Sequence, residues 1–236
     1  MIKAKLSELS IFLPAYNEEG NIATTIIDAR NEAKKVASNY EIIIVNDGST
    51  DRTVEVVKEL QRLDSNIRLI SHTKNRGYGA AVKTGLKACT MDWIFFTDSD
   101  GQFHYDELDK FVAASGSADL VIGYRRKRMD PFHRVFVAQV LLKIWNFFLF
   151  GLTVKDVDCA YKLFKREVRD SIKLETESAI TVTELLVKAK SLGYRIIQLP
   201  VTHYARKFGE QTGGNWHVIA KAAKESFKLR RKIRHV

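Results

Sequence analysis

The sequence predicts an α/β protein with a doubly wound, mostly parallel central sheet. Short apolar runs alternate with longer amphipathic segments, apolar residues recur in those segments every three or four positions, and the short runs are continuously apolar. Continuously apolar strands are typical of parallel sheets that helices cover on both faces. The 236 residues are enough for one large domain, which we expect to span residues 1–236.

The first half of the chain repeats the order strand, helix, strand. The expected strands are Leu9–Leu13, Glu41–Val45, Ile67–Ile70 and Trp93–Thr97. The expected helices between them are Asn21–Ala37, Asp51–Leu63 and Gly79–Ala88.

The second half continues this pattern less regularly. Its expected elements are helices at Asp106–Ala114 and Thr181–Leu192, and strands at Asp119–Tyr124, Tyr161–Lys165 and Tyr194–Val201. Val135–Phe150 is almost wholly apolar but short for a membrane span, so we expect a helix that lies in the membrane interface or packs into protein. From about His217 an amphipathic helix is expected, with basic residues along one side, namely Lys221, Lys224, Lys228 and Arg231.

The charge is divided unevenly between the two halves. Residues 1–120 contain 14 lysines and arginines against 18 acidic residues, and the remainder contains 24 against 10. A basic half of this kind commonly meets phosphate, in nucleic acid, anionic lipid or a phosphorylated substrate. Cys89 and Cys159 show neither metal-cluster nor disulfide-framework spacing, and no secretory leader opens the sequence, so we expect a cytoplasmic protein.

Polar loops follow the first four expected strands, at the edge where parallel sheets bind their ligands. These loops contain Pro14–Glu19, Asn46–Asp51, Asn75–Gly79 and Asp98–Gln102. We therefore expect them to converge. Neither common nucleotide-binding glycine fingerprint is present, which argues against dehydrogenases and P-loop proteins.

Asp98 and Asp100 can face the same cleft if the chain turns at Ser99. Paired carboxylates favour a divalent cation, and Mg²⁺ or Mn²⁺ would also neutralise a departing diphosphate. An isolated pair of this kind is more often a solvated turn, so the metal interpretation depends on the convergence of the loops.

The loop after the second strand has a similar double interpretation. Asp47 is expected to be free to accept a hydrogen bond from a nucleotide base or ribose. A cap of the next helix by Ser49 or Thr50 would explain Ser49, Thr50 and Asp51. Glu19 is expected to be an acid at the start of the next helix, where its negative charge interacts favourably with the helix dipole.

At these residues the sequence resembles the family 2 glycosyltransferases of the GT-A fold, and within them the polyprenol- and dolichol-phosphate mannosyl- or glucosyltransferases. The resemblance rests on Pro14–Glu19, Val45–Asp51, Asn75–Gly77 and Asp98–Asp100, and it extends over Gly123–Arg125, Asp156–Arg166 and Pro200–Gly209. It implies a Rossmann-like half that binds the nucleotide sugar, residues 1–124, and a half that binds the acceptor and meets the membrane interface, residues 125–236.

The resemblance also implies roles for single residues. The nucleoside would be held by Pro14, Tyr16, Glu18, Val45 and Asp47. Metal and diphosphate would be bound by Asp98, Ser99, Asp100 and Gln102, with Asp98, Asp100 and Gln102 as the metal ligands. Arg125, Arg134 and Arg206 match positions that bind donor or acceptor phosphates, and the predicted catalytic residues are Asp98, Asp100, Arg125 and Arg206. Asp98–Phe103 departs from the commoner D-A-D-L-Q-H, and Thr212 replaces a phosphate-binding lysine of some relatives, which leaves the sugar open.

The implied reaction is an inverting transfer of a hexose from a nucleotide sugar, of the GDP-mannose or UDP-glucose type, to a polyprenyl or dolichyl phosphate. A lipid phosphate is anionic at neutral pH and needs no general base, so arginines are expected around it; Arg126 and Arg128 either join them or lie in a solvated loop. We expect the protein on the cytoplasmic face of the membrane, attached peripherally.

Two other functions stay open. Transfer to a sugar hydroxyl of a glycan or glycolipid would need a base, for which Asp156 or Asp158 is the candidate. A non-enzymatic protein that binds nucleotides or nucleic acid is the second, but the basic half lacks regular aromatic interleaving and zinc-finger spacing, so no nucleic acid is expected as a partner. The six histidines show no paired metal-ligand spacing, and His203 is of interest because it lies beside Arg206.

Overall fold

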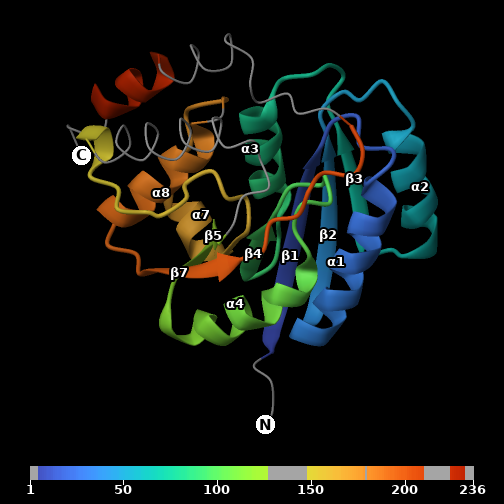
Figure 1. Ribbon diagram of the computed structural model, residues 1–236, viewed down its shortest axis with the longest axis horizontal. Coiled ribbons are helices and arrows are strands. Elements are labelled where there is room, and N and C mark those ends of the chain that lie inside the picture. The colour runs from blue at the N-terminus through green and yellow to red at the C-terminus, as the bar shows by residue number, and fades with distance from the viewer. Residues whose placement is uncertain (1–4, 127–147, 179, 210–223, 232–236) are drawn as a thin grey trace.

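The computed structural model describes residues 5–126, 148–178, 180–209 and 224–231 (Figure 1). Arg128, Arg134, Thr212, Lys221 and most of the expected helix Val135–Phe150 lie outside the described residues.

One seven-stranded sheet organises the described residues. Its strands are β1 (Leu6–Ala15), β2 (Ala37–Asn46), β3 (Ile67–Ser71), β4 (Trp93–Phe96), β5 (Leu120–Arg125), β6 (Lys162–Lys165) and β7 (Ile196–Val201), in the spatial order β3-β2-β1-β4-β6-β5-β7. Strand β6 runs antiparallel to both neighbours, β4 and β5, whereas the other neighbouring strands are parallel. The predicted doubly wound, mostly parallel α/β architecture is therefore confirmed.

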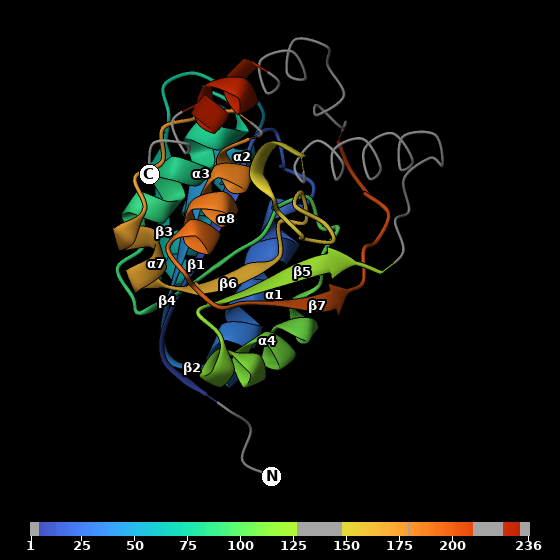
Figure 2. The ribbon, with the colours of Figure 1, turned by 90° about the vertical axis from the view of Figure 1, so that its left-hand side faces the viewer.

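Helices cover both faces of this sheet. They are α1 (Ile22–Val36), α2 (Thr53–Leu63), α3 (Tyr78–Ala88), α4 (Leu108–Ala114), α7 (Arg166–Ser171) and α8 (Thr181–Ser191). Helices α3 and α8 lie together on one face, and α1 and α4 lie together on the other (Figures 1 and 2). None of the helices among the described residues has the length and apolar character needed to cross a bilayer.

The expected elements are found with shifted ends. Strand β2 begins at Ala37, immediately after α1, because its ladder with β1 already starts at the pair Leu6–Ala37, before the apolar run. The helix expected from Asp106 opens with a 3₁₀ turn at Tyr105–Glu107, and α4 starts at Leu108. The short helix α7 was not predicted.

Close packing fixes α3 against its surroundings. A Cβ atom at Gly85 would lie 2.3 Å from the Phe12 ring of β1, and one at Gly79 would lie 2.3 Å from the carbonyl oxygen of Ser178. Because only glycine allows these approaches, the first turn of α3 is held against the segment that precedes α8. That turn follows the third polar loop.

Candidate active site

The polar loops converge at the carboxyl ends of the strands, as predicted. The Asn17 amide donates to Ser49 Oγ at 3.0 Å, which joins the loops after β1 and β2. Ser99 Oγ donates to the Pro14 carbonyl oxygen at 2.7 Å, which joins the loops after β1 and β4. Asp47 accepts from the Gly77 amide at 2.7 Å, which brings in the loop after β3. Residues far apart in sequence thus form one edge.

Ser99 forms the turn that holds Asp98 and Asp100 together. Its side chain is buried and bonds to Pro14 of β1, and its carbonyl oxygen accepts from Thr25 Oγ1 at 3.2 Å, so Ser99 is held against the protein and supports the turn. Asp98 and Asp100 are partly buried and interact electrostatically. Burial, reinforced by the Asp100 carboxylate, raises the pKa of Asp98, and burial also raises the pKa of Asp100.

This pair of carboxylates fits a divalent cation. Burial raises the pKa of both acids, and Asp100 raises that of Asp98 further, so the nearby cationic side chains do not fully offset the cost of two buried negative charges; a hard cation with oxygen ligands would offset it. Within the described residues, no three His, Cys, Asp or Glu side chains gather into a metal site. The remaining ligands would therefore be water and phosphate oxygens, as is common for Mg²⁺.

Gln102, the third predicted metal ligand, is held by hydrogen bonds to the Asp100 side chain and to the Tyr204 backbone. Its amide nitrogen donates to Asp100 Oδ1 at 3.0 Å, and its side-chain nitrogen donates to the Tyr204 carbonyl oxygen at 3.1 Å. Tyr204 returns a hydrogen bond from its own amide to the Gln102 carbonyl oxygen at 2.9 Å. Gln102 therefore connects the Asp98–Asp100 turn to the segment after β7.

That segment brings Arg206 to the two acidic loops. The Arg206 guanidinium forms an ion pair with Glu18, and its Nη1 lies 3.6 Å from Asp100 Oδ2. Burial raises the pKa of Glu18, with a further contribution from Asp100, against hydrogen bonds from Asn21 and Arg206. The predicted residues Glu18, Asp100 and Arg206 are thus brought together from three parts of the chain.

Arg125 lies in a different arrangement from the one predicted. Its Nε and Nη2 donate to the two oxygens of Asp156 at 2.7 and 2.9 Å, and both side chains are almost completely buried. In this structure the guanidinium that was expected to meet phosphate is paired within the protein. The same pair engages Asp156, one of the two candidate bases for transfer to a hydroxyl.

The residues predicted to hold the nucleoside differ in accessibility. Tyr16 is exposed, whereas Pro14 and Val45 are buried, and Val45 belongs to the hydrophobic core. The Asp47 carboxylate is not free, contrary to expectation: it is buried and accepts from His72 Nδ1 at 2.6 Å and from the amides of Arg76 and Gly77. A carboxylate has about four acceptor positions, so about one is left for a ligand.

The expected cap of α2 by Ser49 or Thr50 is not found. Helix α2 begins after Arg52 without a side-chain cap hydrogen bond, and Ser49 and Thr50 contact Asn17 in the loop after β1 instead. Asp51 Oδ1 accepts from the Thr53 amide at 3.0 Å. Glu19 Oε2 accepts from the Arg52 amide at 2.9 Å, so this acid stabilises the start of α2 and not the helix that it precedes. The error arose because contacts between loops are not visible in local sequence.

Two residues near the acidic pair were missed. The Tyr78 side chain, at the start of α3, hydrogen-bonds with Asp98. Lys162, at the start of β6, is fully buried; its Nζ donates to the carbonyl oxygens of Val157 and Cys159 and interacts electrostatically with Asp98. A tyrosine between two glycines and a lysine in a short strand carry no signal that would have singled them out.

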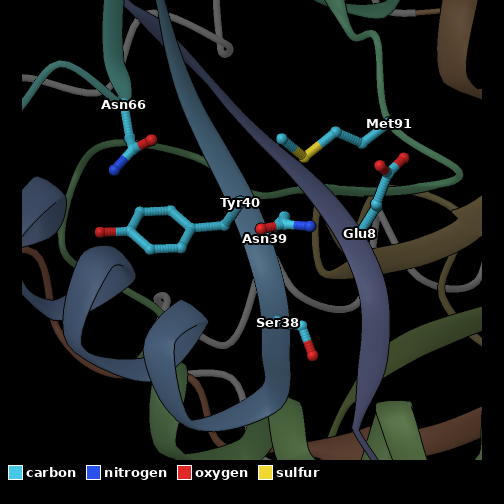
Figure 3. Close-up of a pocket in the computed structure, with 6 residues that line it drawn as sticks. All are labelled: Glu8, Ser38, Asn39, Tyr40, Asn66 and Met91. Atoms are coloured by element: carbon cyan, nitrogen blue, oxygen red, sulfur yellow. The ribbon is translucent and has the colours of Figure 1, made fainter.

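The opposite end of the sheet has a separate cavity of about 390 Å³ (Figure 3). It is lined by residues at or before the starts of strands, namely Glu8, Ser38, Asn39, Tyr40, Asn66 and Met91. It includes none of the predicted site residues, which lie mainly in the polar loops at the carboxyl ends of the strands.

Comparison with known proteins agrees with this geometry. A family model described as glycosyl transferase family 2 matches residues 10–172. An undecaprenyl-phosphate 4-deoxy-4-formamido-L-arabinose transferase of Aeromonas hydrophila is 28% identical over 214 residues, which cover 89% of this chain and 64% of that protein. A dolichyl-phosphate beta-glucosyltransferase of Saccharomyces cerevisiae is 31% identical over 220 residues, which cover 82% of this chain and 66% of that protein. The chain thus spans slightly less than two thirds of each relative's length.

Solved structures confirm the GT-A fold. Glucosyl-3-phosphoglycerate synthase from Mycobacterium tuberculosis, in complex with Mn²⁺, uridine diphosphate and glucosyl-3-phosphoglycerate, matches with a TM-score of 0.65 and 22% identity over 95% of this chain and 76% of that chain. The same enzyme with Mg²⁺ and uridine diphosphate matches with a TM-score of 0.66 and 19% identity over 94% of this chain and 78% of that chain.

Proposed function

Because this chain belongs to glycosyl transferase family 2, we propose that it transfers a hexose from a nucleotide sugar to a polyprenyl phosphate, using a divalent metal held by Asp98 and Asp100. The observation that carries the proposal is the pair of partly buried carboxylates at the edge where the polar loops meet. The two curated relatives, named for undecaprenyl-phosphate and dolichyl-phosphate transfer, support the choice of acceptor. The proposed donors are GDP-mannose, UDP-glucose and UDP-N-acetylhexosamine.

The acidic pair and its neighbours each have a part in the proposed reaction. When bound, Mg²⁺ or Mn²⁺ would neutralise the nucleoside diphosphate as it leaves. Ser99 keeps Asp98 and Asp100 on one turn, and Tyr78 orients Asp98 through a hydrogen bond. Arg206 supplies a guanidinium for a phosphate on the same side. A single in-line displacement would invert the anomeric carbon.

The proposed acceptor needs no general base, and one of the two candidate bases is already paired within the protein. A phosphate oxygen attacks as an anion, whereas a sugar hydroxyl needs a group to accept its proton. Asp156 is bound at both oxygens by Arg125, which makes it a poor proton acceptor. Transfer to a hydroxyl would therefore depend on Asp158, the other candidate.

A polyprenyl acceptor requires contact with a bilayer, and we propose that the protein is peripheral on the cytoplasmic face. Residues 224–231 are helical; Ser226 and Leu229 are buried against the protein. Lys224, Phe227, Lys228 and Arg231 are all exposed and follow the spacing of one helical face. An aromatic residue flanked by three cations suits an anionic lipid surface.

A donor screen tests the proposal. Purified protein is incubated with a polyprenyl phosphate, Mg²⁺ or Mn²⁺, and each radiolabelled donor in turn, and the labelled lipid is extracted and counted. We expect one donor to give labelled lipid, with loss of the product in EDTA and a fall of about a hundredfold or more in Asp98→Asn and Asp100→Asn. Undiminished product in both variants would contradict the proposed metal site, and no product from any donor with the wild type would contradict the proposed reaction.

A further inference from the structure

Arg206 is shared between two acidic residues that come from different loops. Glu18 follows β1, Asp100 follows β4, and Arg206 follows β7, and the three side chains meet with little exposure to solvent. The guanidinium binds Glu18 directly and approaches Asp100 at 3.6 Å. One cation therefore partly neutralises two carboxylates, one of which belongs to the proposed metal pair.

The backbone around Arg206 is anchored by further contacts, one of which uses the guanidinium itself: Arg206 Nε donates to the Phe208 carbonyl oxygen at 2.7 Å. Tyr204 exchanges two hydrogen bonds with Gln102, at 2.9 and 3.1 Å. Phe208 packs so closely on Gly20 that a Cβ atom there would lie 2.8 Å from the Phe208 ring. Because the chain is held on both sides of Arg206, the nitrogen that approaches Asp100, Nη1, can change partners while Nε stays on Phe208 and the segment stays in place.

We propose that Arg206 is an exchangeable counter-ion: it neutralises Asp100 in the free protein and turns to the donor's diphosphate when Asp100 binds a divalent cation. This inference rests on the proposed function and assigns Arg206 the step that couples metal binding to diphosphate binding. Arg206 contacts Asp100 only at 3.6 Å but forms a direct ion pair with Glu18, so the contact with Asp100 is the first to break. Glu18 then keeps the guanidinium beside the diphosphate.

The exchange has an unusual electrostatic consequence. A guanidinium beside Asp100 repels a bare divalent cation but attracts a cation–diphosphate complex, whose charge is negative. Removing the charge of Arg206 should therefore strengthen the binding of the bare cation and weaken the binding of the cation–diphosphate complex. A residue that only supported the fold would weaken both.

Calorimetric titration of Mn²⁺ alone, and then of UDP and GDP in the presence of Mn²⁺, tests the inference. Arg206→Met should bind Mn²⁺ alone at least about threefold more tightly, and the favoured nucleoside diphosphate about tenfold more weakly. Arg206→Lys keeps the charge and should bind Mn²⁺ alone as the wild type does. Arg206→Gln serves if the methionine variant does not fold, as judged by its thermal transition.

Arg166→Met is the matched control, because Arg166 pairs with Asp92 at an exposed position away from the acidic loops. It should leave both affinities unchanged. Weaker binding of both Mn²⁺ and nucleoside diphosphate in Arg206→Met, or no change in either, would overturn the inference while leaving the proposed function intact. Failure of the wild type to bind Mn²⁺ and either nucleoside diphosphate would overturn both.

Discussion

Arg125 and Asp156 form a two-point ion pair at the end of β5. The two nitrogens of the guanidinium meet the two carboxylate oxygens at 2.7 and 2.9 Å, and the Arg125 amide adds a third hydrogen bond at 3.2 Å. The exposed fraction of the side chain is 11% for Arg125 and 5% for Asp156. The pair therefore joins the end of β5 to the loop before β6 and neutralises its own charge.

Breaking this pair should destabilise the fold. Asp156→Asn leaves the Arg125 charge buried without its partner, and a loss of about 3–5 kcal/mol in the free energy of unfolding is expected. Urea denaturation measures it. Asp92→Asn, which removes an exposed partner of Arg166, is the control and should cost less than about 1 kcal/mol. Equal effects of the two substitutions would show that burial of the pair contributes nothing.

The acidic pair should make the stability of the metal-free protein depend on pH. Burial and Asp100 raise the pKa of Asp98 to about 7, above its value of about 3.9 in an unfolded chain. The stability that comes from protonating Asp98 is therefore present at low pH and lost as the pH rises towards 7.

Asp98→Asn cannot titrate and should lack this loss. With EDTA present, its free energy of unfolding relative to the wild type should increase from about pH 4 to about pH 7 and then level off. Urea denaturation at several pH values gives the difference. A difference that is constant with pH would mean that Asp98 ionises normally.

Lys162 should be a stabilising residue despite its burial. Lys162→Met removes the donor to the carbonyl oxygens of Val157 and Cys159 and should lower the free energy of unfolding by about 1–3 kcal/mol. Lys165→Met is the control in the same strand, because Lys165 forms a more exposed ion pair with Asp119. If the two variants unfold at the same urea concentration, the buried hydrogen bonds of Lys162 have no net effect.

The exposed face of the helix at residues 224–231 should bind anionic membranes. Phe227→Ala, and charge reversal of Lys224 and Lys228, should each reduce co-sedimentation with vesicles that contain phosphatidylserine, at about 1 kcal/mol for each lysine lost. Leu63→Ala, which removes an exposed apolar side chain of α2, should have no effect. Undiminished sedimentation of the Phe227 and lysine variants would assign the membrane contact to another surface.

The sequence allowed most of the fold to be predicted because buried parallel strands are continuously apolar. Ile42–Val45 and Trp93–Phe96 show this, and the acids that follow Trp93–Phe96 could be assigned to the ligand-binding edge. The direction of β6 was not predictable, since its four residues, two apolar side chains between two lysines, give the same pattern read in either direction.

The partners of charged groups could not be predicted, because tertiary structure selects them. Arg206 meets Glu18 across a separation of 188 residues. Nothing in the local sequence distinguishes the paired Arg125 from an arginine that is open to phosphate. Val45 shows the converse case, since its place in an apolar run already indicated that its side chain is buried.

The most direct test of the central claim is the binding of Mn²⁺ by the protein in the presence of UDP or GDP. Titration calorimetry on the wild type, Asp98→Asn, Asp100→Asn and the distant control Asp119→Asn provides the comparison. One Mn²⁺ should bind to the wild type and to the control, with affinity reduced by about a hundredfold or more in each of the other two variants. Equal affinity in all four proteins would show that Asp98 and Asp100 are not the metal ligands.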